Sequence, residues 1–182
     1  MKTFLNILLV IWQLPQIILG AIIYFIASVL FKVKRKKIDI VGEHIDELKF
    51  GINFINLKAN EILNPKSINF IYIKSPIGFG VSLSKYFILL SKEYERFLDL
   101  TVKHEYGHAI QSVYLGPLYL IIIGLPSVLG NLYDRIFHKN WKSVDRIKWY
   151  YNQPVEKWAD KLGRVDRTEQ INVYTYGEIV NK

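Results

Sequence analysis

Cysteine is absent from this chain of 182 residues. Neither a disulfide framework nor a zinc site with thiolate ligands can therefore form, and a reducing compartment is compatible with the composition. Internal repeats and low-complexity segments are also absent. The length suits one domain that is large enough to bury a hydrophobic core.

Acidic residues are few, since 16 Asp and Glu stand against 24 Lys and Arg, which gives a net charge of +8. Part of the basic excess is concentrated in a cluster at positions 32 and 34–37. Attraction to anionic lipid is worth about 1 kcal/mol per basic residue near the surface. Because this cluster borders an apolar segment rather than a recognition element, we expect membrane lipid and no nucleic acid as a partner.

Hydrophobic residues make up 51% of the chain, and the mean hydropathy of +0.14 is high for a soluble domain. The segment from Leu5 to Phe31 has no charged residue and is longer than the about 20 residues that cross a bilayer. We therefore expect an N-terminal transmembrane helix, kinked near Trp12–Gln16. Basic residues after such a helix usually stay in the cytoplasm, which predicts an anchor at residues 1–37 and a cytoplasmic domain at residues 38–182.

The sequence His-Glu-Tyr-Gly-His at residues 104–108 carries the clearest chemical signal. Two histidines four residues apart project from one face of a helix, so both imidazoles can bind one zinc ion. Glu105 can then act as general base for a water molecule that the metal activates. We expect this helix to begin with Asp99 as N-cap and to end at Gly116, with Gly107 leaving room for a close neighbour such as the sheet. A helix with merely polar His and Glu side chains is the alternative.

A tetrahedral zinc site with an open position needs a third protein ligand. Residues 152–163 are typical of a short helix, with Pro154 in its first turn and Gly163 just past its end. Glu156 and Asp160 lie one turn apart on this helix. Glu156 can therefore be the third ligand, and Asp160 can accept a hydrogen bond from a ligand imidazole. A solvated face on which Glu156 pairs with a lysine is the competing interpretation.

His-Glu-Tyr-Gly-His at 104–108, followed by Glu-Lys-Trp-Ala-Asp at 156–160, resembles the membrane gluzincins. These include the CAAX-prenyl endopeptidases and the heat-shock-type zinc endopeptidases of bacterial membranes. The resemblance implies an α+β, zincin-like metallopeptidase domain with active-site helices and a small sheet. It also implies Zn²⁺ as the cofactor, with the ligands His104, His108 and Glu156, the general base Glu105 and the hydrogen-bond partner Asp160. The downstream Arg or His that stabilises the family's transition state has no assignable match here.

β-branched and aromatic residues predict strands at residues 69–74, 80–84, 86–91 and 171–176. A helix at residues 43–50 and an alternating apolar pattern at 52–57 are also expected. The segment 78–82 is the candidate for an edge strand that pairs with an extended substrate, with a plain hairpin as the alternative.

A second uncharged apolar segment covers residues 113–132. One crossing would place Glu156 on the opposite side of the membrane from His104 and His108, and two crossings need about 40 residues. We therefore expect a re-entrant or interfacial segment, with a buried core helix as the alternative. Three residues beyond it are the nearest candidates to donate a hydrogen bond to an oxyanion: His138, Tyr150 and Tyr151.

These patterns favour a membrane-associated zinc endopeptidase that hydrolyses a peptide or protein substrate, which can itself be membrane-associated. Two alternatives stay open. One is a non-catalytic membrane protein whose structural zinc site serves a binding module or scaffold. The other is a membrane-surface adaptor in which the basic cluster and the apolar segments matter and zinc does not.

Overall fold

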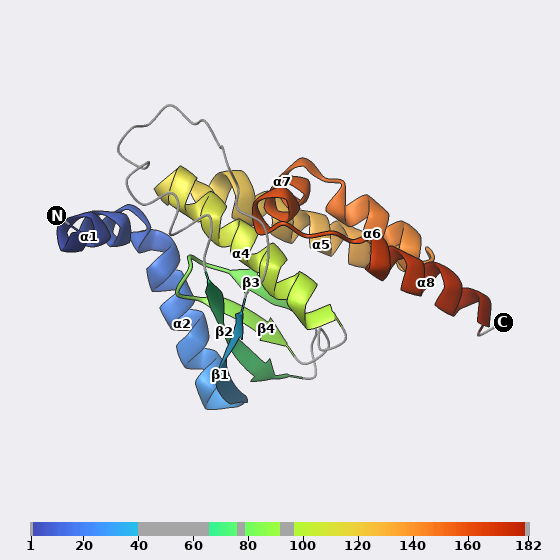
Figure 1. The fold of residues 1–182 in the computed structure, drawn as a ribbon, viewed down its shortest axis with the longest axis horizontal. Helices are drawn as coiled ribbons and strands as arrows, with labels where there is room; N and C mark the ends of the chain where they lie inside the picture. The colour runs from blue at the N-terminus through green and yellow to red at the C-terminus, as the bar shows by residue number, and fades with distance from the viewer. Residues whose placement is uncertain (1, 40–65, 76–78, 92–96, 181–182) are drawn as a thin grey trace.

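The structure is a computed structural model that describes residues 2–39, 66–75, 79–91 and 97–180. Within these ranges, helices combine with one four-stranded sheet, which confirms the expected α+β class (Figure 1). The helix predicted at 43–50 and the alternating pattern at 52–57 lie outside the described residues.

The sheet has the strand order β1-β2-β4-β3. β2 (Ser67–Lys74) pairs antiparallel with β1 (Lys32–Asp39) and parallel with β4 (Ile88–Ser91), and β3 (Gly80–Ser82) pairs antiparallel with β4. The three strands predicted between residues 69 and 91 are therefore confirmed, with shorter second and third strands. Among the described residues β4 is the only neighbour of β3, which leaves β3 at an edge of the sheet.

The basic cluster lies in β1, at the opposite edge of the sheet. Most of its Lys and Arg side chains are exposed, which suits an edge strand because charged side chains discourage pairing with other chains. β1 follows α2 directly and continues to Asp39, so the boundary expected between residues 37 and 38 falls inside a strand.

The N-terminal apolar segment forms two helices, α1 (Lys2–Trp12) and α2 (Leu14–Leu30), which are bent by 76°. This confirms the predicted kink. The bend docks on the last turn of α4 (Leu98–Leu115), where Trp12 Nε1 donates a hydrogen bond to the Val113 carbonyl at 3.0 Å. That carbonyl has no helical partner, since Pro117 lacks an N–H group.

The segment 113–132 divides between several elements. The chain leaves α4 through the 3₁₀ turn η2 (Gly116–Leu118), then forms the π-helical turn η3 (Leu120–Gly124) and α5 (Leu125–Phe137). α5 contacts η3, α6 and α7. Only 17% of the window Leu120–Phe137 is buried, so the alternative of a buried core helix is wrong.

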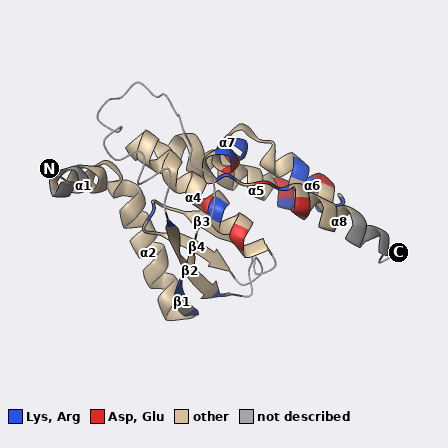
Figure 2. Cartoon of the chain, in the orientation of Figure 1, with Lys and Arg blue, Asp and Glu red and all other residues tan. Residues whose placement is uncertain are grey.

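Two parts of the described chain have the length and hydropathy of a membrane span. These are Leu120–Phe137 and, taken together, the bent pair Asn6–Trp12 and Leu14–Leu30. α2 contains no Lys, Arg, Asp or Glu, and its ribbon is tan in Figure 2.

The remaining helices are α6 (Ser143–Tyr151), α7 (Pro154–Gly163) and α8 (Thr168–Val180). α8 includes residues 171–176, so the strand predicted there is wrong. Two features outweigh the β-branched composition of this segment. Asp166 caps the start of the helix, because Thr168 N donates to Asp166 Oδ1 at 2.9 Å, and the helix packs against α6. α4 packs on the sheet through buried apolar residues at helical spacing: Val102, Tyr106, Ala109, Ile110 and Val113.

Candidate metal centre

Helices α4 and α7 cross in close contact because each has a glycine at the crossing. A Cβ atom on Gly107 would overlap the carbonyl oxygen of Ala159, and one on Gly163 would overlap that of Lys103. The close neighbour of Gly107 is therefore α7, and the expectation that it is the sheet was wrong. α4 begins at Leu98, with Asp99 inside its first turn rather than at the N-cap, and it ends at Gly116 as predicted.

His104 and His108 from α4 meet Glu156 from α7 at this crossing. One potential ligand atom from each residue lies within 4.8 Å of the others. His104 Nε2 and His108 Nε2 lie 3.1 Å and 3.2 Å from the same oxygen, Glu156 Oε2. All three side chains are buried. The structure thus brings together the three residues that the sequence indicated as ligands.

The second nitrogen of each imidazole is held by a hydrogen bond. His104 Nδ1 donates to Asp160 Oδ1 at 2.7 Å, as the sequence predicted. His108 Nδ1 donates to Gln111 Oε1 at 2.7 Å, and Gln111 Nε2 in turn donates to the Val155 carbonyl at 2.9 Å. These bonds fix the tautomers that leave Nε2 free as a ligand. Sequence reasoning missed Gln111, although its place three residues after His108 on the same helix face was a usable signal.

The contacts at this crossing shift the pKa values of His104, Glu156 and Asp160. Burial alone would lower the pKa of His104, but hydrogen bonds to Asp160 and Glu156 outweigh it and raise that pKa to about 9. Burial would raise the pKa of Glu156, yet hydrogen bonds from His104 and His108 hold it far below its usual value. The pKa of Asp160 is also lowered, because bonds from His104 and Arg167 outweigh its burial. Both carboxylates are therefore ionised at neutral pH.

The cluster fits a divalent cation. Glu156 Oε1 is buried and finds no hydrogen-bond partner within the described part of the chain. A bound cation would satisfy this orphaned oxygen. Two imidazole nitrogens and one carboxylate form the donor set that zinc takes in many catalytic sites. The group of His104, His108 and Glu156 can therefore hold a metal ion.

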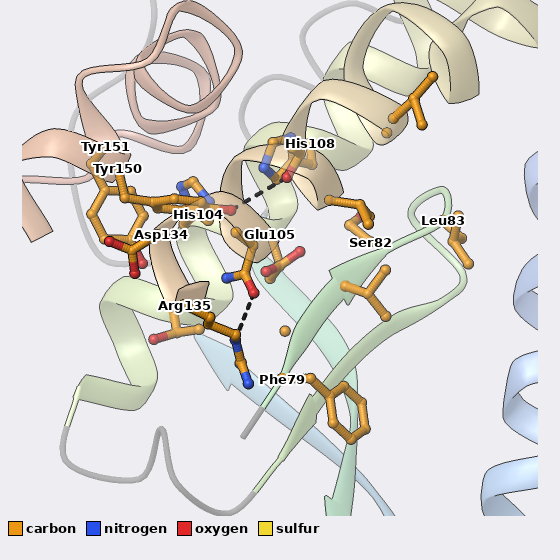
Figure 3. A pocket seen from close by; sticks show the side chains of 18 of the residues that line it. Phe79, Ser82, Leu83, His104, Glu105, His108, Asp134, Arg135, Tyr150 and Tyr151 are labelled. Atoms are coloured by element: carbon orange, nitrogen blue, oxygen red, sulfur yellow. Dashed lines mark hydrogen bonds between the residues drawn. The ribbon is translucent and has the colours of Figure 1, made fainter. Parts of the chain in front are cut away.

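A cavity of about 1180 Å³ is lined by His104, His108 and Glu105. Figure 3 shows Glu105 between His104 and the strand that carries Ser82. Gly80 on β3 makes room for this carboxylate, because a Cβ atom there would crowd Glu105 Oε1. Burial raises the pKa of Glu105, although the neighbouring histidines oppose that rise. The apolar lining comes partly from α2 and α5: Leu19, Ile23, Leu125 and Val128.

Two of the three oxyanion candidates, Tyr150 and Tyr151, line this cavity. His138 is not among its lining residues; its ring stacks on Trp141 with centroids 3.7 Å apart, and its Nδ1 lies 3.3 Å from Asp134. Tyr119 also lines the cavity, and its hydroxyl donates to the Ser82 carbonyl at 2.8 Å. No pattern around Tyr119 in the sequence indicated this position.

Comparisons of the chain with family models, with curated proteins and with solved structures found no match. Its function must therefore be inferred from its own residues.

Proposed function

We propose that the protein is a membrane-associated, zinc-dependent endopeptidase of the gluzincin type. The observation that supports this best is the buried group of His104, His108 and Glu156, with Glu105 in the adjoining cavity. The first three residues would hold the ion. Zinc supplies Lewis-acid chemistry when bound, since it makes water acidic enough to react near neutral pH and polarises a carbonyl group. Three protein ligands beside a cavity suit a catalytic site, whereas structural zinc sites usually have four.

Glu105 performs the proton transfers in this proposal. As a carboxylate it removes a proton from the attacking water, whose oxygen forms a bond with the carbonyl carbon of the substrate. The same side chain then gives that proton to the amide nitrogen as the C–N bond breaks, so an amine and a carboxylic acid form, and the acid loses its remaining proton to solvent at neutral pH. Tyr150 and Tyr119 keep their protons at neutral pH, because burial raises the pKa of each phenol.

Strand β3 offers a binding surface for an extended substrate. It lines the cavity through Gly80, Val81 and Ser82, beside Glu105, and β4 is its one described neighbour. A peptide added along its edge would gain backbone hydrogen bonds while its side chains fill the cavity. This is the role expected for the segment 78–82, of which residue 78 lies outside the described residues.

Membrane association is supported by the exposed apolar faces of α2 and of the segment Leu120–Phe137. An apolar surface of this extent is costly in water and gains free energy in a bilayer. Strand β1 places exposed lysines directly after α2, where they would meet anionic headgroups. Basic residues at this end of α2 favour the cytoplasmic side for the sheet and the metal centre.

Glu105→Gln in the full chain, reconstituted in liposomes, tests the proposal against a purely structural zinc site. Zinc content should stay at the wild-type level, because Glu105 is not one of the three ligands. Cleavage of a fluorogenic peptide library should fall by about a hundredfold to ten-thousandfold, the usual contribution of a general base. Glu169→Gln, an exposed position on α8, is the matched control and should leave both quantities unchanged.

Two results would contradict the proposed hydrolysis. Wild-type protein that binds zinc and cleaves no peptide would support the structural zinc site. Glu105→Gln that cleaves as fast as the wild type would remove the general base from the proposal.

A further inference from the structure

Arg167 lies between α7 and α8 and is linked through Asp160 to His104, one of the three proposed metal ligands. Its Nε donates to Asp160 Oδ2 at 2.6 Å, and its Nη2 donates to Asp160 Oδ1 at 2.7 Å. The planar guanidinium group thus engages both oxygens of one carboxylate, a geometry that a lysine ammonium cannot reproduce. Asp160 Oδ1 also accepts the hydrogen bond from His104 Nδ1.

The Arg167 side chain is itself fixed on two further sides. Its Nη1 donates to Gln170 Oε1 at 2.8 Å, and its guanidinium carbon lies 3.1 Å from the ring centroid of Tyr151. The Tyr151 ring and the His104 imidazole pack in a T-shaped arrangement, with centroids 5.1 Å apart and an angle of 85°. The His104 imidazole is therefore held by Asp160 and by Tyr151, and both of these contact Arg167.

We propose that Arg167 is a positioning residue that holds the His104 imidazole in its metal-binding orientation through Asp160 and Tyr151. A free imidazole rotates about two side-chain bonds, and an Asp160 carboxylate without Arg167 can rotate as well. The bidentate bond from Arg167 prevents rotation of the Asp160 carboxylate and thereby fixes the direction of His104 Nε2. His108 is held differently, through the neutral amide of Gln111.

Two substitutions separate positioning from charge. Arg167→Met removes a positive charge near the cation, which by electrostatics alone would strengthen zinc binding. Arg167→Lys keeps the charge and loses the planar two-point bond. Positioning predicts weaker zinc binding in both variants, by about tenfold to a hundredfold, the range found when the hydrogen-bond partner of a ligand is lost.

Arg146→Lys is the matched control. Arg146 forms a comparable two-point bond with a largely buried carboxylate, that of Asp134, and this pair joins α6 to α5 without touching a metal ligand. Its zinc affinity should equal that of the wild type. Zinc affinity is measured by competition with a chromophoric chelator, and thermal unfolding in excess chelator reports on the metal-free fold. The cobalt-substituted absorption spectrum adds a direct view of ligand geometry.

The inference rests on the proposed metal site but not on peptide hydrolysis. Wild-type protein that binds no zinc would refute the metal site itself. Wild-type affinity in Arg167→Lys, or an equal loss in Arg146→Lys, would overturn the role of Arg167 alone. Failure of both Arg167 variants to fold in chelator would also overturn it, because Arg167 would then determine the fold rather than the orientation of His104.

Discussion

Gly107→Ala is expected to separate α4 from α7 and so to disrupt the metal centre. The new Cβ atom would stand 2.7 Å from the carbonyl carbon of Ala159 and still closer to its oxygen. Ordinary contacts between carbon atoms are about 3.5–4.0 Å long. The two helices must therefore move apart by about 1 Å, because the neighbour is a helix backbone rather than a flexible side chain.

A displacement of this size matters because Glu156 lies on α7, while His104 and His108 lie on α4. Metal–ligand distances must fall within about 0.2 Å of their preferred values. A shift of about 1 Å exceeds this tolerance several-fold, so zinc affinity should fall by more than the about 10- to 100-fold that loss of an outer hydrogen bond costs. Overpacking should also destabilise the fold by about 1–3 kcal/mol.

Gly124→Ala provides the control for the effect of alanine in a helical segment. A Cβ atom at Gly124 meets its nearest neighbours at 3.8 Å, an ordinary contact, so zinc affinity should not change. Zinc affinity is measured by chelator competition, and stability by thermal unfolding with and without zinc. Gly107→Ala that binds zinc as tightly as the wild type, with unchanged stability, would refute the close crossing of α4 and α7.

Two further predictions concern protons and the N-terminal bend. Zinc has to displace the proton of His104, whose pKa is raised to about 9, so zinc affinity should fall by up to about tenfold per pH unit as the pH drops from about 9 towards neutrality. A flat pH profile in chelator competition would contradict this. Trp12→Phe leaves the buried Val113 carbonyl without the indole donor, which should cost about 1 kcal/mol of stability, measured by thermal unfolding in micelles. An unchanged midpoint would show that this bond does not stabilise the docked bend.

The parts of the site that the sequence predicted are those that depend only on the spacing of residues along a single helix. His108 follows His104 by four positions, and Asp160 follows Glu156 by four, which places each pair on one helix face whatever the rest of the chain does. The central strands were predictable for a similar reason, since β-branched runs mark buried strands. Residues 171–176 show the limit of that signal, because the same composition lies in helix α8, where the cap and the packing against α6 outweigh local preference.

The position of Arg167 could not be predicted, because it depends on how the chain turns after α7. Arg164 adopts a left-handed conformation with φ 56°, and Val165 N bonds back to the Asp160 carbonyl at 2.9 Å. This turn brings Arg167 to the Asp160 side chain. Non-glycine residues adopt such a φ in a small minority of cases, so the sequence pattern around Arg164 does not predict this turn.

The distance between the two motifs depends on the glycines rather than on the ligands. Helix axes usually lie 8–10 Å apart, a separation set by the side chains at the contact. Gly107 and Gly163 have none, so the backbones of α4 and α7 approach closely enough for one short carboxylate to reach two imidazoles. A histidine–glutamate motif indicates which atoms can bind a metal. The small residues on the facing helix surfaces decide whether those atoms meet, and they are visible only once the partner helix is known.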